Sequence, residues 1–218
     1  MTRVADSFAW PFRGTWGPKW VLGVIGVLLM PLFFVPLLGY AIAATREAER
    51  DPSTGPPAWH LSSRLVTDGI WTSVAILIVS LPFAVGFNVL SSWLIYVHLY
   101  RSSDPAVTQL FAQVLAICIL ALPFGLVLLL LMPNATAAYA ASGRPRDLFD
   151  PVRAVSALRH DFPTWNLAAA AIVTAWAIGL ACGGFFCIGL VPGVFYAILV
   201  SAHASAALQR QGDDSSTG

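Results

Sequence analysis

Four long stretches without any Asp, Glu, Lys or Arg constrain the fold of this chain more than any other feature. They are Trp20–Thr45, Gly69–Tyr100, Pro105–Gly143 and Phe162–Gln209. Only 11% of all residues are charged, against roughly a quarter in a typical soluble domain. Because hydrocarbon cannot hydrate an ion, we expect these stretches to lie in a lipid bilayer. The sequence therefore predicts a membrane protein that crosses the bilayer several times.

The lengths of the stretches predict an all-α fold, a polytopic transmembrane helical bundle of about five spans. A helix needs about 20 apolar residues to cross about 30 Å of hydrocarbon. The last stretch is too long for one crossing, so it must fold back, and Cys182-Gly183-Gly184 is the expected turn. Pro133-Asn134 is expected to end the third span. We place the spans at about 20–44, 70–99, 105–132, 164–183 and 187–208.

The chain is predicted to form one transmembrane domain, residues 20–208, between two short flanking segments. Residues 1–19 interleave aromatic side chains with Arg13 and Lys19, a composition typical of an anchor at the membrane interface. Residues 209–218 are polar and predict a short disordered tail.

Two Asp-Pro pairs predict where helices begin. Asp104-Pro105 and Asp150-Pro151 each place a capping carboxylate before a proline suited to the first helical turn. The first pair opens the third span. The second predicts an amphipathic surface helix with an apolar side made of Val152, Val155, Leu158 and Phe162.

The distribution of positive charges predicts the orientation of a five-span chain in the plasma (cytoplasmic) membrane. Loops 46–68 and 144–161 and the C-terminus carry eight Lys and Arg residues, and the opposite side carries four. Since positive charges favour the cytoplasmic side, we expect both long loops and the C-terminus there, and the N-terminus outside.

The sequence offers little basis for catalysis, cofactor binding or metal binding. A net charge of +1 gives no field for nucleic acid. No Gly-x-Ser-x-Gly elbow or phosphate-binding loop occurs, and Lys19 is the only lysine. His98 and His203 fall at opposite sides of the predicted membrane, so they cannot share a haem iron. We therefore predict no enzyme and assign no catalytic, cofactor or metal residues.

The fourth and fifth spans carry small residues at every fourth position, which predicts a tightly packed helical hairpin. A spacing of four keeps small side chains on one ridge and lets two backbones approach closely. The two ridges either pack against each other within the chain or form a dimerisation face. Packing within the chain is favoured because the two ridges are adjacent in sequence. The ridges include Ala171, Ala175, Gly179 and Gly183, and Gly189, Gly193 and Ala197.

A candidate polar strip runs along the second span through Ser80, Asn88 and Ser91. An unsatisfied amide in hydrocarbon is costly, so Asn88 needs a partner. The strip is interpreted either as a helix-packing contact, which we favour, or as the lining of a permeation path. Cys182 and Cys187 flank the expected outer turn and are either free thiols or a disulfide pair.

A degenerate repeat of helix ends supports this topology. Each end has small residues and one aromatic ring and is followed by an arginine. The repeat occurs around Tyr40 and Arg46, around Tyr139 and Arg144, and around His203 and Arg210. The first two ends are followed by Pro57-Ala58-Trp59 and Pro163-Thr164-Trp165.

Together with Lys19-Trp20, Gly39-Tyr40, Asp68-Gly69 and Ile188-Gly189, these residues carry a resemblance over most of the chain. The chain resembles the uncharacterised prokaryotic membrane family catalogued as domain of unknown function 4013 (DUF4013). The resemblance implies an integral membrane protein and supplies no catalytic residue. In this chain His60 stands where an acidic residue is expected.

Three functions fit the sequence, in decreasing order of support. The first is a non-enzymatic accessory or scaffold subunit that packs with other membrane proteins or with itself. The second is a small transporter or channel component that uses the polar strip of the second span. The third is a membrane enzyme acting on lipid headgroups through Arg64, Asp68 and Arg153.

Overall fold

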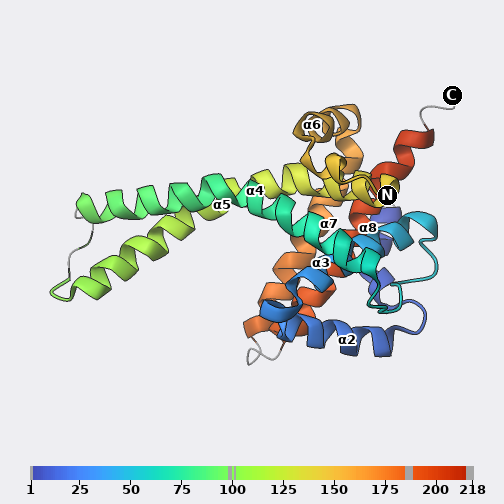
Figure 1. Ribbon diagram of the computed structural model, residues 1–218, viewed down its shortest axis with the longest axis horizontal. Coiled ribbons are helices and arrows are strands. Elements are labelled where there is room, and N and C mark those ends of the chain that lie inside the picture. Colours follow the sequence, from blue (N-terminus) through green and yellow to red (C-terminus); the bar gives the residue numbers. More distant parts are fainter. Residues whose placement is uncertain (1, 98–99, 101, 185–188, 215–218) are drawn as a thin grey trace. The chain divides into compact units, whose positions relative to one another are not determined.

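The computed structural model describes residues 2–97, 100, 102–184 and 189–214, and within them the chain is helical with no β-strand (Figure 1). The all-α prediction is confirmed. The elements are α1 Thr2–Ala9, η1 Trp10–Phe12, α2 Trp16–Leu28, α3 Met30–Arg50, α4 Ser63–Tyr96, α5 Pro105–Ser142, η2 Pro145–Phe149, α6 Pro151–His160, α7 Phe162–Ala181, η3 Cys182–Gly184 and α8 Leu190–Asp214.

The chain divides into two compact units. The first contains Met1–Ser73 and Leu131–Gly218, and the second contains Val74–Leu130. The long helices α4 and α5 each contribute residues to both.

In the first unit α8 is the central helix, packed against α7, α3, α2 and α1 (Figure 1). Its sequence permits this because Phe195 and Leu199 are large and fully buried, while Ala202 and Ala206 give its neighbours room to approach. The same core receives Trp10 from the N-terminal segment and Tyr40 from α3. The N-terminal segment predicted to lie at the interface therefore has its Trp10 inside the protein, whereas Phe12 and Trp16 are exposed.

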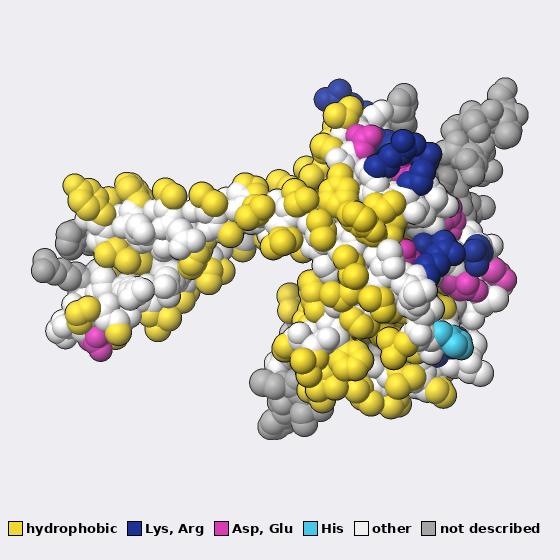
Figure 2. All heavy atoms as spheres, in the orientation of Figure 1, with side chains coloured by type: hydrophobic (Ala, Val, Ile, Leu, Met, Phe, Trp, Pro, Cys, Tyr) yellow, Lys and Arg dark blue, Asp and Glu magenta, His cyan; other side chains and the backbone are white. Residues whose placement is uncertain are grey.

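The second unit is an antiparallel helical hairpin. Leu94 of α4 is buried against Ala112 and Ala116 of α5, and the rings of Phe83 and Phe124 lie 4.7 Å apart. Many large apolar side chains of the hairpin outside this seam are exposed, and Figure 2 shows hydrophobic side chains spread along it. Only 6% of the most apolar window of each helix is buried inside the protein. Such a surface is stable where lipid replaces water.

Four helices are long and apolar enough to cross a bilayer: Ser63–Tyr96, Pro105–Ser142, Phe162–Gly184 and Leu190–Leu208. They correspond to the last four of the five predicted spans. The structure differs in the first stretch, where the single helix expected over 20–44 is broken at Leu29 into α2 and α3. Pro31 explains the break, because it has no N–H to donate to Val27 and its ring crowds the preceding turn. With 13 residues, α2 is about 20 Å long, short of a bilayer crossing.

Other helix ends also differ from the prediction. Pro133 does not end α5, which continues to Ser142. A proline costs the helix one hydrogen bond, but its fixed φ is itself helical, and the turns after it are held by buried residues such as Ala137 and Tyr139. In addition, α8 extends to Asp214, into the segment predicted to be disordered.

Candidate functional site

A buried polar network joins α3, α4 and α5 in the first unit. Asp68 of α4 is 5% exposed, and its Oδ1 accepts a hydrogen bond of 2.7 Å from the hydroxyl of Tyr139 on α5. Its Oδ2 accepts from Nη1 and Nη2 of Arg46 on α3, at 3.1 and 3.2 Å. The two oxygens of one carboxylate therefore bind two different helices.

The third nitrogen of Arg46 completes this network. Its Nε donates to the carbonyl of Ala140, 3.0 Å away, in the last turn of α5. Carbonyls there have no partner within the helix, so the arginine acts as a cap. The helix then ends on Gly143, whose φ of +66° favours glycine and whose N–H donates to the carbonyl of Tyr139.

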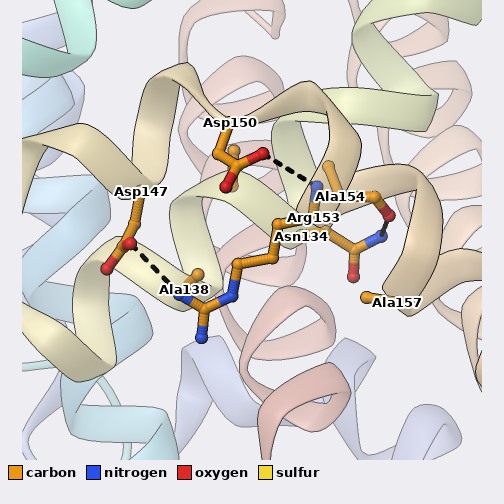
Figure 3. Close-up of a pocket in the computed structure, with 8 residues that line it drawn as sticks. Asn134, Ala138, Asp147, Asp150, Arg153, Ala154 and Ala157 are labelled. Atoms are coloured by element: carbon orange, nitrogen blue, oxygen red, sulfur yellow. Dashed lines mark hydrogen bonds and ion pairs between the residues drawn. The ribbon is translucent and has the colours of Figure 1, made fainter.

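A second cluster surrounds Asp147 in η2, which follows α5. Asp147 is 5% exposed and accepts a hydrogen bond from the Ser142 hydroxyl. Arg144 and Arg153 approach its other sides, with ion-pair distances of 3.5 and 3.1 Å. Figure 3 shows Asp147 and the Arg153 guanidinium pointing toward each other.

The electrostatics of Asp147 follow from these contacts. Burial by itself raises the pKa of its carboxyl, but the hydrogen bond from Ser142 and the charges of Arg144, Arg153 and Arg146 outweigh it. The pKa of Asp147 consequently lies below its ordinary value. The carboxylate is ionised at neutral pH and holds the two guanidiniums in place.

A small cavity of about 30 Å³ lies beside this cluster, and its lining includes Asn134, Asp147, Asp150 and Arg153 (Figure 3). It has room for about one water molecule. Asp150 caps α6 by accepting from the Arg153 N–H at 2.9 Å, and Asn134 donates to the Ala154 carbonyl. The polar groups around the cavity therefore connect α5 to α6. Among the residues described, no three His, Cys, Asp or Glu side chains are grouped to hold a metal ion.

The repeated helix ends each anchor a different segment. The ring of Tyr40 stacks on Trp59 at 3.9 Å and 4°, and its hydroxyl donates to the carbonyl of Pro57. Tyr139 binds Asp68, as described above. His203 lies 2.8 Å from the Ser7 hydroxyl through Nδ1 and packs on the ring of Trp10.

The small-residue ridges of α7 and α8 meet. Gly179 and Gly193 lie at their closest approach, and Ala171, Ala175 and Ala197 are buried. Gly183 lies against Leu190, and Gly189 lies against the carbonyl of Cys182. A small ridge on each helix thus serves contact within the chain.

The predicted polar strip is placed on the α4 part of the hairpin. Asn88 is exposed, and its Nδ2 donates to the carbonyl of Ala84 in the same helix at 2.9 Å. Ser91 is 9% exposed and donates to the Asn88 carbonyl, and Ser80 is half-buried. The donors of Asn88 and Ser91 are thus directed to the backbone of α4.

The remaining candidate residues are dispersed. Cys182 is a free thiol, half-buried in η3. Cys187, with which Cys182 either pairs or not in the prediction from sequence, lies outside the described residues, as does His98. His60 and Arg64 are exposed, whereas Asp68 from the same loop region is buried with Arg46 and Tyr139.

Sequence reasoning missed the three-helix network. It treated Asp68 as a loop charge and Tyr139 as a helix-end ring, because no spacing rule joins residues this far apart. One signal was present: Gly39 and Gly69 lie where α3 and α4 cross. A methyl group on either would collide with a backbone carbonyl of the other helix, that of Leu65 or Val35. This crossing brings Arg46 to Asp68.

The apolar helices define a membrane protein. The model of a family described as protein of unknown function (DUF4013) matches residues 22–201, and the chain belongs to this family. No curated protein and no solved structure matches the chain.

Proposed function

We propose that this membrane protein is a non-catalytic, multi-pass accessory or scaffold subunit that associates with other membrane proteins or with itself through the α4–α5 hairpin. The observation that carries the proposal is the exposure of that hairpin: 6% of the most apolar window of each helix is buried. The hairpin contributes little to the core of its own chain, so most of its surface is available to lipid or to other helices.

Association between helices in lipid depends on close packing and polar contacts, because lipid tails remove the hydrophobic drive. The hairpin offers both. Gly125 of α5 has open space where a side chain would begin. Asn88 of α4 is exposed and uses its Nδ2 within its own helix, and its side-chain oxygen is an acceptor by its chemistry. A neighbouring helix that donates to this oxygen would gain about 0.6–2 kcal/mol.

The buried carboxylates support a structural role rather than a chemical one. Asp68 and Asp147 each accept hydrogen bonds or ion pairs on both oxygens from neighbouring side chains. Groups engaged in this way join helices and are poorly placed to transfer a proton to a substrate. We further propose that the protein lies in the cytoplasmic membrane with its long loops and C-terminus on the cytoplasmic side, as the distribution of Lys and Arg predicts.

The test is the assembly state after extraction in several mild detergents, measured by light scattering and by cross-linking in the native membrane. We expect a complex larger than the monomer. Replacing Asn88→Leu should reduce it, whereas Asn166→Leu, the same change at an exposed position of α7, should not. A monodisperse monomer in every detergent, with no cross-linked product in the membrane, would contradict the proposal.

A further inference from the structure

The arginines in the cluster around Asp147 bind its carboxylate and still have exposed side chains. Asp147 is 5% exposed, but the side chains of Arg144 and Arg153 that bind it are 52% and 53% exposed. Each guanidinium therefore has one edge fixed by the buried carboxylate and another edge open to the surroundings. A guanidinium has five N–H donors, so donors remain for a second acceptor.

A third guanidinium reaches the same place from α4. Nη2 of Arg64 lies 3.8 Å from the point where a side chain on Gly143 would begin. Gly143 immediately precedes Arg144 in the chain. The side chain of Arg64 is exposed. The side chain of Arg146, which follows Arg144 by two residues, is also exposed. Figure 2 shows Lys and Arg side chains gathered close to where Figure 1 places α6.

The charges of this cluster do not balance. The cluster contains Asp147, the capping carboxylate of Asp150 and four arginines, namely Arg144, Arg146 and Arg153 around Asp147 and Arg64 beside Gly143. Four positive charges stand against two negative ones, and one of the two is buried. The remaining positive charge is exposed and concentrated, so it would attract an anion.

The position of the cluster indicates which anion. It lies at the C-terminal end of α5 and is followed by α6 and then by the start of α7, and both α5 and α7 are long and apolar enough to cross a bilayer. Apolar side chains of the same stretch of chain, from η2 to the start of α7, are exposed: Phe149 at 36%, Val152 at 77% and Phe162 at 56%. Guanidiniums beside exposed apolar residues at the end of a span match the boundary between phosphate groups and acyl chains.

We propose that Arg64, Arg144 and Arg153 bind the phosphate of an anionic phospholipid headgroup, with Asp147 as the positioning residue that holds two of them. Arg146 adds charge at the same site. The exposed apolar side chains of α6 and its neighbours lie against the acyl chains of the same lipid. This site is independent of the proposed association through the α4–α5 hairpin, because it lies on other residues and needs no second protein.

The experiment measures lipid retention by native mass spectrometry of the purified protein in detergent, titrated with phosphatidylglycerol or with phosphatidylcholine. We expect the protein to retain phosphatidylglycerol preferentially. Arg64→Gln should weaken that retention about fivefold, which corresponds to about 1 kcal/mol for one basic side chain at a membrane surface. Arg64 is the preferred variant because it leaves the contacts of Asp147 intact. Arg159→Gln is the matched control, since it removes the same charge from the distal end of α6.

Asp147→Asn separates a positioned site from general attraction. It makes the protein more positive, so non-specific electrostatics predicts tighter binding of phosphatidylglycerol. The positioned site predicts weaker binding, because Arg144 and Arg153 lose the carboxylate that orients them. Three results would each overturn the proposal. They are tighter binding of phosphatidylglycerol by Asp147→Asn, equal effects of Arg64→Gln and Arg159→Gln on lipid retention, and retention without preference for the anionic lipid. Competition by millimolar inorganic phosphate would overturn the assignment to a lipid.

Discussion

Gly179 of α7 and Gly193 of α8 lie backbone against backbone. A methyl carbon on Gly179 would be 2.5 Å from the carbonyl oxygen of Gly193, and one on Gly193 would be 2.5 Å from the carbonyl oxygen of Gly179. Real side-chain carbons do not come this close to an oxygen, so neither position accepts even alanine without separating the helices. The contact is reciprocal, and it brings α7 and α8 together in the first unit.

Gly193→Ala should therefore destabilise the protein, although alanine favours a helix over glycine by about 1 kcal/mol. Overpacking costs typically about 1–3 kcal/mol, and here the obstacle is backbone, which cannot rotate away. We expect a lower unfolding temperature in detergent. The control is Gly125→Ala on α5, where nothing in the chain lies within 4 Å of the new carbon, so that within the monomer only the gain in helix propensity remains. Equal effects of the two substitutions would contradict the backbone contact.

Tyr139→Phe should lower the free energy of unfolding by about 2 kcal/mol, because it removes a hydrogen bond to a buried carboxylate. Asp68→Leu should cost more, about 3–5 kcal/mol, since it leaves the Arg46 guanidinium buried without its partner. The double change Arg46→Met with Asp68→Leu should recover part of that loss. Thermal unfolding in detergent measures all three. Tyr96→Phe, on a ring that is 79% exposed, should have no effect.

The Asp147 cluster predicts a dependence of stability on pH. The pKa of Asp147 in the folded protein lies below its ordinary value, so the ionised carboxylate stabilises the fold at higher pH. That contribution is lost as the pH falls through the folded pKa, where both states become protonated. The difference in unfolding temperature between the natural protein and Asp147→Asn should be largest near neutral pH and shrink on acidification. A difference in unfolding temperature that grows with acidification would show that the pKa of Asp147 is raised in the folded protein rather than lowered.

Cysteines introduced at Ser80 and Asn88 should not react with a water-soluble maleimide in intact membranes. Both positions lie on α4 in the hairpin that we propose is covered by lipid or another helix, and the Asn88 amide bonds to the backbone of α4. A cysteine at Ser103, in the connection between α4 and α5, should react. The natural cysteines are first replaced by alanine. Rapid labelling at Ser80 and Asn88 would instead support a water-filled path and the transporter interpretation.

Local chemistry predicted several features correctly. Asp104 accepts from the N–H of Ala106 at 2.8 Å, and Asp150 accepts from that of Arg153, so both Asp-Pro pairs begin helices as expected. Caps and spans are predictable because they depend on residues a few positions apart. The ridges of α7 and α8 were predictable for a similar reason, since a tight turn leaves few ways to pair two neighbouring helices.

Features that depend on distant residues were not predictable in this way. Pro31 breaks the first apolar stretch at Leu29, whereas Pro133 leaves α5 continuous. The two prolines have the same local effect on hydrogen bonding. Buried packing holds the turns after Pro133, and the sequence does not display that packing.

The sequence by itself determined that this chain is helical and belongs in a membrane, because the exclusion of charge from hydrocarbon acts on every residue of a long stretch independently. Only the tertiary structure decided that Arg46, Asp68 and Tyr139 meet, and that Asp147 holds Arg144 and Arg153 with open edges. Arg46 and Asp68 meet because α3 and α4 cross where Gly39 and Gly69 let their backbones touch. Which helices cross is a property of the whole packing rather than of any local pattern.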